Sequence, residues 1–223
     1  YYLLPSIKLK NFCLLTFSLV FYAFGENIYI LLMLASIGSN HLMTIGIYHA
    51  KKVNSGQEKY WFFLALTVNF GTLLFFKYAN FFADNINLLF GENLFQFDSI
   101  HLPLGISFYT FQAVSYVFDI YRHKELEKPH LLKTALYISL FPQLIAGPII
   151  RYKTIATELA HRLHKKSDFS EGIRRFVIGL SKKVLIADPL AVVADNIFAM
   201  GPSDISSSIA WVGITCYTLQ IYF

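Results

Sequence analysis

The chain has 223 residues, of which 55% are hydrophobic and only 15% are charged, and its mean hydropathy is +0.48. A soluble domain carries roughly 25% charged residues, so this composition excludes an ordinary soluble fold and favours a membrane protein. The formal net charge is +5, but the basic residues gather in particular loops, and this placement argues for membrane orientation rather than nucleic-acid binding.

Uncharged runs recur along the chain, and several approach the ~20 residues that a membrane-spanning helix needs. A soluble core of this size could hold one such run, but not all of them. We therefore expect an all-α, polytopic helical bundle in the lipid bilayer. The runs are Asn11–Gly25, Asn27–Ala50, Tyr60–Phe76, Ser99–Phe118, Thr134–Ile150 and Ile205–Phe223.

The first three helices are expected at residues 11–24, 28–49 and 60–82. Lys51, Lys52 and Lys59 lie between the second and third of these helices, whereas residues 81–100 contain no lysine or arginine. Basic loops remain on the cytoplasmic side of a membrane. This alternation places the loop at Lys51 in the cytoplasm and predicts a multi-pass membrane protein.

A fourth helix is expected to follow Leu102-Pro103, because proline suits the first turn of a helix, and to end at Arg122. Gln112, Tyr116 and Asp119 lie at positions i, i+4 and i+7 of this helix and therefore share one face. A polar stripe on a membrane helix turns toward protein or water. The pattern leaves two interpretations open. Asp119 orders the helix end by pairing with Arg122 or His123, or the stripe lines a cavity.

The uncharged run at residues 134–150 is interrupted by Pro142, Gly147 and Pro148. Broken backbone at membrane depth is tolerated only where protein buries it or where it lines a watery cavity. Gly147 permits either a close backbone approach or an unusual φ angle. We expect this segment to face such an interior, with Gln143, Gly147, Pro148 and Arg151 as candidate cavity-lining residues.

The flanks of this run decide its predicted path. The chain enters from a basic connection and leaves at Arg151 and Lys153, so both flanks are expected in the cytoplasm. We predict a re-entrant segment that turns near residues 142–148, and a kinked full crossing is the alternative. Beyond it, Ile155, Leu159 and Leu163 recur at a spacing of four, which predicts an amphipathic helix at Lys153–Lys166 on the membrane surface.

Further helix starts are expected at Asp168 with Glu171, which resemble a capping pair, and at Asp188-Pro189. Arg175, Lys182 and Lys183 form a cationic group between them. They either attract an anionic cytoplasmic donor or contact anionic lipid headgroups, and the sequence leaves both open.

The sequence lacks the spacings of a metal site, a P-loop, a dinucleotide-binding loop or a nucleophile elbow. Cys13 and Cys216 lie in apolar runs and are expected to act as small hydrophobic residues. The residues alone therefore predict a polar-lined membrane interior without a catalytic constellation.

Several ordered motifs resemble the membrane-bound O-acyltransferase (MBOAT) family, and more narrowly its bacterial alginate O-acetyltransferase branch. They are Leu102–Gln112 (LPLGISFYTFQ), Phe141–Tyr152 (FPQLIAGPIIRY), Lys182–Asp188 (KKVLIAD) and Tyr217–Phe223 (YTLQIYF). The resemblance implies an inner-membrane enzyme that moves an acetyl group from a cytoplasmic donor, such as acetyl-CoA, toward an exported polysaccharide such as alginate. It also implies periplasmic acetyltransferases as partner proteins and no tightly bound cofactor.

The resemblance further implies that residues 1–223 are the N-terminal part of a single MBOAT-like domain, cut at both ends. The family's essential histidine is expected beyond Phe223, so no residue here is assigned a catalytic role and this portion alone is expected to be inactive. Three alternatives remain. They are a transporter or channel for acyl groups or polysaccharide, a structural subunit that recruits a periplasmic partner, and a teichoic-acid D-alanyl transfer protein of the same family.

Overall fold

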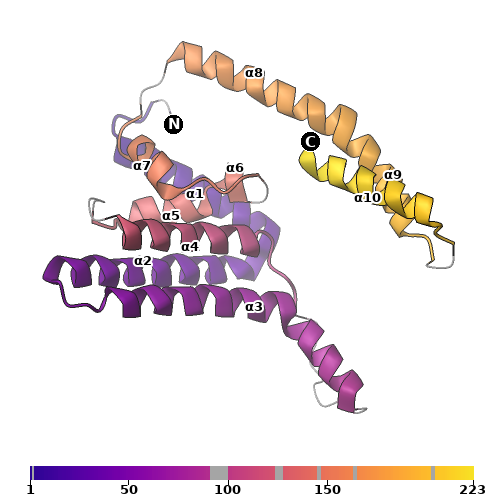
Figure 1. The fold of residues 1–223 in the computed structure, drawn as a ribbon. Coiled ribbons are helices and arrows are strands. Elements are labelled where there is room, and N and C mark those ends of the chain that lie inside the picture. Colours follow the sequence, from indigo (N-terminus) through magenta and orange to yellow (C-terminus); the bar gives the residue numbers. More distant parts are fainter. Residues whose placement is uncertain (2, 91–99, 124–127, 145–146, 163–164, 202–203) are drawn as a thin grey trace. The chain divides into compact units, whose positions relative to one another are not determined.

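The computed structural model describes the chain except residues 2, 91–99, 124–127, 145–146, 163–164 and 202–203. Every regular element in the described residues is a helix, which confirms the expected all-α class (Figure 1). The chain divides into two compact units, Tyr1–Arg162 and Leu163–Phe223. The expectation of one domain over the whole chain stays a prediction.

The first unit begins with three long helices, and local chemistry sets their ends. They are α1 (Ile7–Glu26), followed by a 3-10 turn (Asn27–Tyr29), α2 (Ile30–Val53) and α3 (Glu58–Phe90). The Ser6 hydroxyl accepts a hydrogen bond from the N–H of Leu9, so α1 starts before its first apolar run. Asn54 takes the left-handed conformation that ends α2, with φ 52°. All three helices exist as expected, and each extends past the end of its uncharged run.

The fourth helix, α4 (Ile106–Arg122), ends where the sequence predicts but begins later. Pro103 lies outside the helix, and its carbonyl accepts from the N–H of Ile106 at 3.2 Å in a turn. Gly105 lies directly before the helix with φ 71°, a left-handed conformation that favours glycine. The expected role of Pro103 in the first helical turn is therefore wrong.

The core of the first unit lies where α2, α3 and α4 pack side by side and where α1 packs on the short helix α5 (Leu131–Ser139) (Figure 1). By length and composition, two stretches of the described residues could cross a membrane, Ile7–Val53 and Glu58–Phe90. The other uncharged runs form shorter helices, because Gly105 and the residues around Pro142 interrupt them.

Two asparagines join α2 to α3 inside this core. Asn40 and Asn69 are both buried, and each side-chain amide donates to the other's oxygen, at 3.1 and 2.8 Å. Each amide also donates to a carbonyl on its own helix, at Ser36 and Ala65. In an apolar environment such reciprocal amides fix the register of two helices, because any shift leaves polar groups unpaired.

Asn69→Leu is expected to lower the unfolding free energy of the protein by roughly 0.6 to 1.7 kcal/mol, the range found for hydrogen bonds between membrane helices. The loss arises because Asn40 then keeps a buried amide without its partner. Thermal unfolding in detergent should show it, and Asn40→Leu/Asn69→Leu should lose less than the sum of the two single variants. Additive losses would show that the two amides do not act as a pair.

The second unit contains α8 (Lys166–Lys182), a π-helical turn (Lys183–Ala187), α9 (Asp188–Phe198) and α10 (Ser207–Tyr222). α9 and α10 pack closely on one another, since a Cβ at Gly213 would lie 2.8 Å from Ile197. The helix runs through Asp188 with helical backbone angles, so this residue is not the N-cap that the sequence suggests. The capping pair is also wrong, because α8 begins at Lys166 and Glu171 binds Arg174 and Arg175 instead.

Candidate functional site

The broken segment turns back on itself along α4. α5 leads into α6 (Phe141–Leu144), and after the turn the chain returns to α7 (Tyr152–Ala160). Three hydrogen bonds to α4 trace this path. The Thr134 hydroxyl donates to Tyr116 Oη at 3.0 Å, Gln112 Nε2 donates to the Gln143 carbonyl at 3.3 Å, and Asp119 Oδ2 accepts from the Lys153 N–H at 3.1 Å. The segment thus runs toward the start of α4 and returns to its end.

Three tyrosines hold the two arms of this loop together. The rings of Tyr116, Tyr137 and Tyr152 are buried, and Tyr152 meets the other two edge-on, with centroids 4.7 and 5.3 Å apart. The Tyr137 hydroxyl donates to the carbonyl of Ile150 at 2.7 Å, which links α5 directly to the returning arm. Offset or edge-on aromatic pairs add packing energy beyond their buried area. This cluster keeps the reversal closed at its base.

Two glutamines hold the tip of the loop. Gln143 Nε2 donates to the Tyr137 carbonyl at 3.0 Å, near the end of α5, while its own carbonyl accepts from Gln112. Gln112 is only 1% exposed, and its Oε1 has no hydrogen-bond partner among the described residues. A buried amide oxygen without a partner is costly. Gln112 therefore presents a free acceptor beside the turn, suited to a hydroxyl or amide donor but not to proton abstraction.

The start of α4 also touches the loop. A Cβ built at Gly105 would lie 2.7 Å from the carbonyl oxygen of Leu144, closer than side chains approach backbone. Glycine is therefore required there twice, for its positive φ and for the close contact with α6. Sequence reasoning missed this residue, although a glycine directly before a helix and after a proline turn was the available signal.

Asp119 is 8% exposed and accepts from the N–H of Lys153, in the first turn of α7. A carboxylate there meets an unpaired helical N–H and the positive end of the helix dipole. Its partner is neither Arg122 nor His123, the two pairings that the sequence suggests. α7 itself ends at Ala160, short of the expected Lys166, because His161 is extended with φ −141°.

The structure brings four of the predicted site residues together and leaves the others apart. Gln112, Tyr116, Asp119 and Gln143 all join α4 to the loop, whereas Gly147, Pro148 and Arg151 are exposed in the returning arm. Gly147 has φ 106°, and a Cβ there would meet no atom within 4 Å. Of the two possibilities for this glycine, the structure shows the unusual φ and not the close approach.

The predicted cationic group lies in the second unit. Arg175 Nε donates to Glu171 at 2.9 Å, and Lys183 Nζ donates to Asp188 at 2.8 Å. Hydrogen bonds from Arg174 and Arg175 lower the pKa of the Glu171 carboxyl below its usual value. Lys182 lies over the ring of Phe223, 5.8 Å from its centroid. All three cations are exposed, and two of them have acidic partners.

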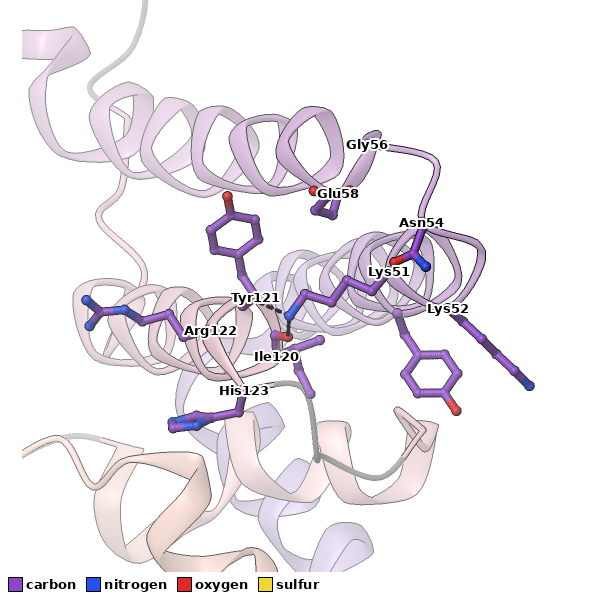
Figure 2. Close-up of a pocket in the computed structure, with 10 residues that line it drawn as sticks. Lys51, Lys52, Asn54, Gly56, Glu58, Ile120, Tyr121, Arg122 and His123 are labelled. Atoms are coloured by element: carbon purple, nitrogen blue, oxygen red, sulfur yellow. Dashed lines mark hydrogen bonds between the residues drawn. The ribbon is translucent and has the colours of Figure 1, made fainter.

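A pocket of about 810 Å³, which sequence reasoning missed, lies where the ends of α2 and α4 meet (Figure 2). Lys51 reaches into it and donates to the carbonyls of Ile120, at 2.8 Å, and Tyr121. Figure 2 shows Lys52 and Arg122 pointing away from this contact on opposite sides. Lys51 thus donates hydrogen bonds to the last carbonyls of α4, an arrangement that stabilises a helix end.

Lys51→Met is expected to lower the unfolding free energy by about 1.5 to 3 kcal/mol, the range for hydrogen bonds made by a charged group. The methionine keeps the length of the side chain but leaves two carbonyls at the end of α4 unpaired. Thermal unfolding measured beside Lys52→Met, at an exposed neighbouring position, separates this contact from the loss of a positive charge. Equal changes in the two variants would contradict the capping role.

Within the described residues, no three His, Cys, Asp or Glu side chains lie close enough to hold a metal ion. The arrangement around α4 offers hydrogen-bond donors and acceptors, closely packed aromatic rings and a carboxylate engaged with backbone. Its chemistry is that of binding and positioning.

Comparisons with known proteins agree on one family. Residues 58–223 match the model of the membrane-bound O-acyltransferase family. The chain is 39% identical to a "Probable alginate O-acetylase AlgI" of Azotobacter vinelandii, and 38% identical to a protein of the same name from Pseudomonas aeruginosa. Both alignments cover 100% of this chain but 44% and 43% of those proteins.

A "Peptidoglycan O-acetyltransferase" of Helicobacter pylori is 33% identical over 92% of the chain and 44% of its own length. No solved structure matches significantly. The chain thus spans less than half the length of these curated relatives.

Proposed function

Because the chain belongs to the membrane-bound O-acyltransferase family, we propose that the full-length protein transfers acetyl groups from a cytoplasmic donor, such as acetyl-CoA, toward an exported polysaccharide such as alginate. The observation that carries the proposal is the 39% identity to a probable alginate O-acetylase over the whole chain. Periplasmic acetyltransferases that complete the modification are the proposed partner proteins.

The proposed setting is a multi-pass bundle in the bacterial inner membrane. α1 and α3 carry large exposed aromatic side chains, among them Phe17 at 65% and Phe63 at 62% exposure, which suit contact with lipid. Lys51 and Lys52 in the last turn of α2 and Lys59 at the start of α3 flank the loop between these helices, which favours a cytoplasmic position for it.

This orientation makes the loop at α5 and α6 re-entrant from the cytoplasmic side, because its two ends meet the C-terminal half of α4. Its chemical use follows from its position. The loop lets polar backbone and the Gln112 amide reach into the membrane without a full crossing, and protein at least partly buries the hydrogen bonds of Gln112 and Gln143. A donor entering from the cytoplasm and an acceptor entering from outside could meet there across a thinned barrier. The Gln112 oxygen can orient a hydroxyl at such a point, and since an amide does not take up the proton, the proposed base is the histidine expected beyond Phe223.

The relative from Helicobacter pylori supports a second acceptor class, the glycan of peptidoglycan. Both acceptors are sugars that carry free hydroxyl groups, so the donor side of the reaction is the same. Family membership favours either transferase over a channel or transporter.

The proposal is tested with the full-length protein in an alginate-producing bacterium whose own alginate O-acetylase gene is deleted. Ester-bound acetate on secreted alginate should return, and acetate on purified peptidoglycan should stay at the level of the empty vector. Acetate gained only on peptidoglycan would favour the second acceptor. Acetate gained on neither polymer, by a protein that accumulates in the membrane, would contradict acetyl transfer to both.

The orientation makes a separate prediction, tested with single cysteines in a variant where Cys13 and Cys216 are serine. A cysteine at Asn54 should react with a membrane-impermeant maleimide only in inverted vesicles, whereas one at Leu102 should react in intact cells. Both residues are exposed. The reverse pattern would show that the bundle has the opposite orientation, and the loop would then enter from the periplasmic side.

A further inference from the structure

α8 carries an apolar stripe that its own unit does not cover. Five of its six large apolar side chains recur at spacings of three and four along one face of the helix, which is the pattern of an amphipathic helix, and the sixth, Ile178, lies on the opposite side. No residue of α8 is buried, and in this unit the close helix pair is α9 with α10. The stripe consists of Phe169, Ile173, Phe176, Val177 and Leu180, with exposed fractions from 49% to 69%.

The rest of the helix is strongly basic. Residues 165–183 contain six lysines and arginines but only two acidic side chains. Glu171 is shared by Arg174 and Arg175, at 3.0 and 2.9 Å, so one carboxylate serves two guanidinium groups. The helix therefore combines an apolar face with a surplus of positive charge that its own residues do not neutralise.

We propose that α8 lies flat in the cytoplasmic surface of the bilayer, with its apolar stripe between the acyl chains and its cations against anionic phospholipid headgroups. The charge pattern favours this occupant of the stripe, because one plane of the membrane supplies both an apolar boundary and negative charge. A membrane-crossing path is unfavourable, since the arginines lie mid-helix and Lys182 and Lys183 follow within a few residues.

The length of α8 and the distribution of its apolar residues also distinguish it from α3 of the first unit. α3 has 33 residues and contains an apolar stretch long enough to cross a membrane. α8 has only 17 residues, about 25 Å of helix, and its large apolar residues other than Ile178 lie on one side. This inference rests on the membrane placement in the proposed function and is independent of the acyl-transfer reaction.

The test uses the full-length protein, with Cys13, Cys216 and any later cysteines replaced by serine, in vesicles of phosphatidylcholine with one-third phosphatidylglycerol. An environment-sensitive nitrobenzoxadiazole label is attached at Phe176→Cys on the stripe or at Ser181→Cys outside it. Lipids with a nitroxide near the headgroup or near the chain end then report depth. Phe75→Cys on α3, which is 56% exposed, serves as the membrane control.

At position 176 we expect strong quenching by the shallow nitroxide, at least twofold above the deep one, and at position 181 quenching by aqueous iodide instead. Replacing phosphatidylglycerol with phosphatidylcholine should reduce the shallow quenching at 176. Absence of nitroxide quenching at 176 would show that protein covers the stripe, and stronger deep quenching would show a crossing helix. Either result overturns the inference. Absence of quenching at position 75 as well would instead contradict the membrane placement itself.

Discussion

Gly105→Ala is expected to abolish the activity of the full-length enzyme and to lower its yield of folded protein. The residue holds φ 71°, where an L side chain costs about 1 to 3 kcal/mol. The added Cβ would also lie 2.7 Å from the Leu144 carbonyl oxygen, so α6 must move away from α4. Because Gln143 of α6 is held by Gln112, that movement would open the tip of the loop.

The matched control for this variant is Gly71→Ala on α3, where a Cβ would meet no atom within 4 Å. Acetyl transfer, elution from gel filtration and thermal unfolding in detergent should all stay close to wild type for the control. A Gly105→Ala enzyme with wild-type activity and stability would mean that the approach of Leu144 to Gly105 is not needed for the working structure.

Asp119→Ala is expected to reduce acetyl transfer by roughly tenfold or more, a change that corresponds to about 1.4 kcal/mol in the barrier. The variant removes the acceptor for the N–H of Lys153, so the packing of Tyr152 on Tyr116 is left to hold the first turn of α7 to α4. That turn is where the broken segment ends, so the returning arm loses one of its attachments. Activity of the full-length protein, normalised to its amount in the membrane, measures the effect.

Asp119→Asn distinguishes two roles of this residue. Asparagine keeps a carbonyl acceptor for the N–H of Lys153 but has no charge. If Asp119 only positions α7, the asparagine variant should keep activity within about threefold of wild type, a smaller loss than the tenfold expected for Asp119→Ala. Asp84→Ala, on an exposed part of α3, controls for the loss of one carboxylate. If the asparagine variant is as inactive as the alanine variant, the charge itself is needed, and the cavity-lining interpretation of the stripe gains support.

Much of the fold follows from patterns that the sequence displays openly. The runs at Asn11–Gly25, Asn27–Ala50 and Tyr60–Phe76 predict α1, α2 and α3, because long apolar segments satisfy their backbone only as helices. Pro142 and Gly147 indicate the broken segment, because they interrupt an apolar run that would otherwise be expected to form one continuous helix. Gln112, Tyr116 and Asp119 were found by their spacing, because residues at i, i+4 and i+7 share a face.

Three local signatures did not predict the helix ends correctly. The helix at Lys153 ends early, and Asp168 and Asp188 cap nothing, although each has a plausible local signature. Capping patterns state only what a side chain can do. In the structure, the Glu171 carboxylate forms ion pairs with Arg174 and Arg175, and the Asp188 carboxylate pairs with Lys183. These carboxylates bind charged side chains instead of the backbone N–H groups at a helix start.

Composition and residue order were enough to predict the membrane class, the all-helical fold, the position of the break and the family. These follow from composition and order, which need no knowledge of distant contacts. Only the tertiary structure decided what the polar residues bind. Asp119 holds α7, Gln112 holds Gln143, and Lys51 closes the end of α4. The close backbone approach that the sequence allowed at Gly147 is found at Gly105 instead. The physical reason is that hydrogen bonds and van der Waals contacts act over a few ångströms, so their partners are set by packing rather than by spacing along the chain.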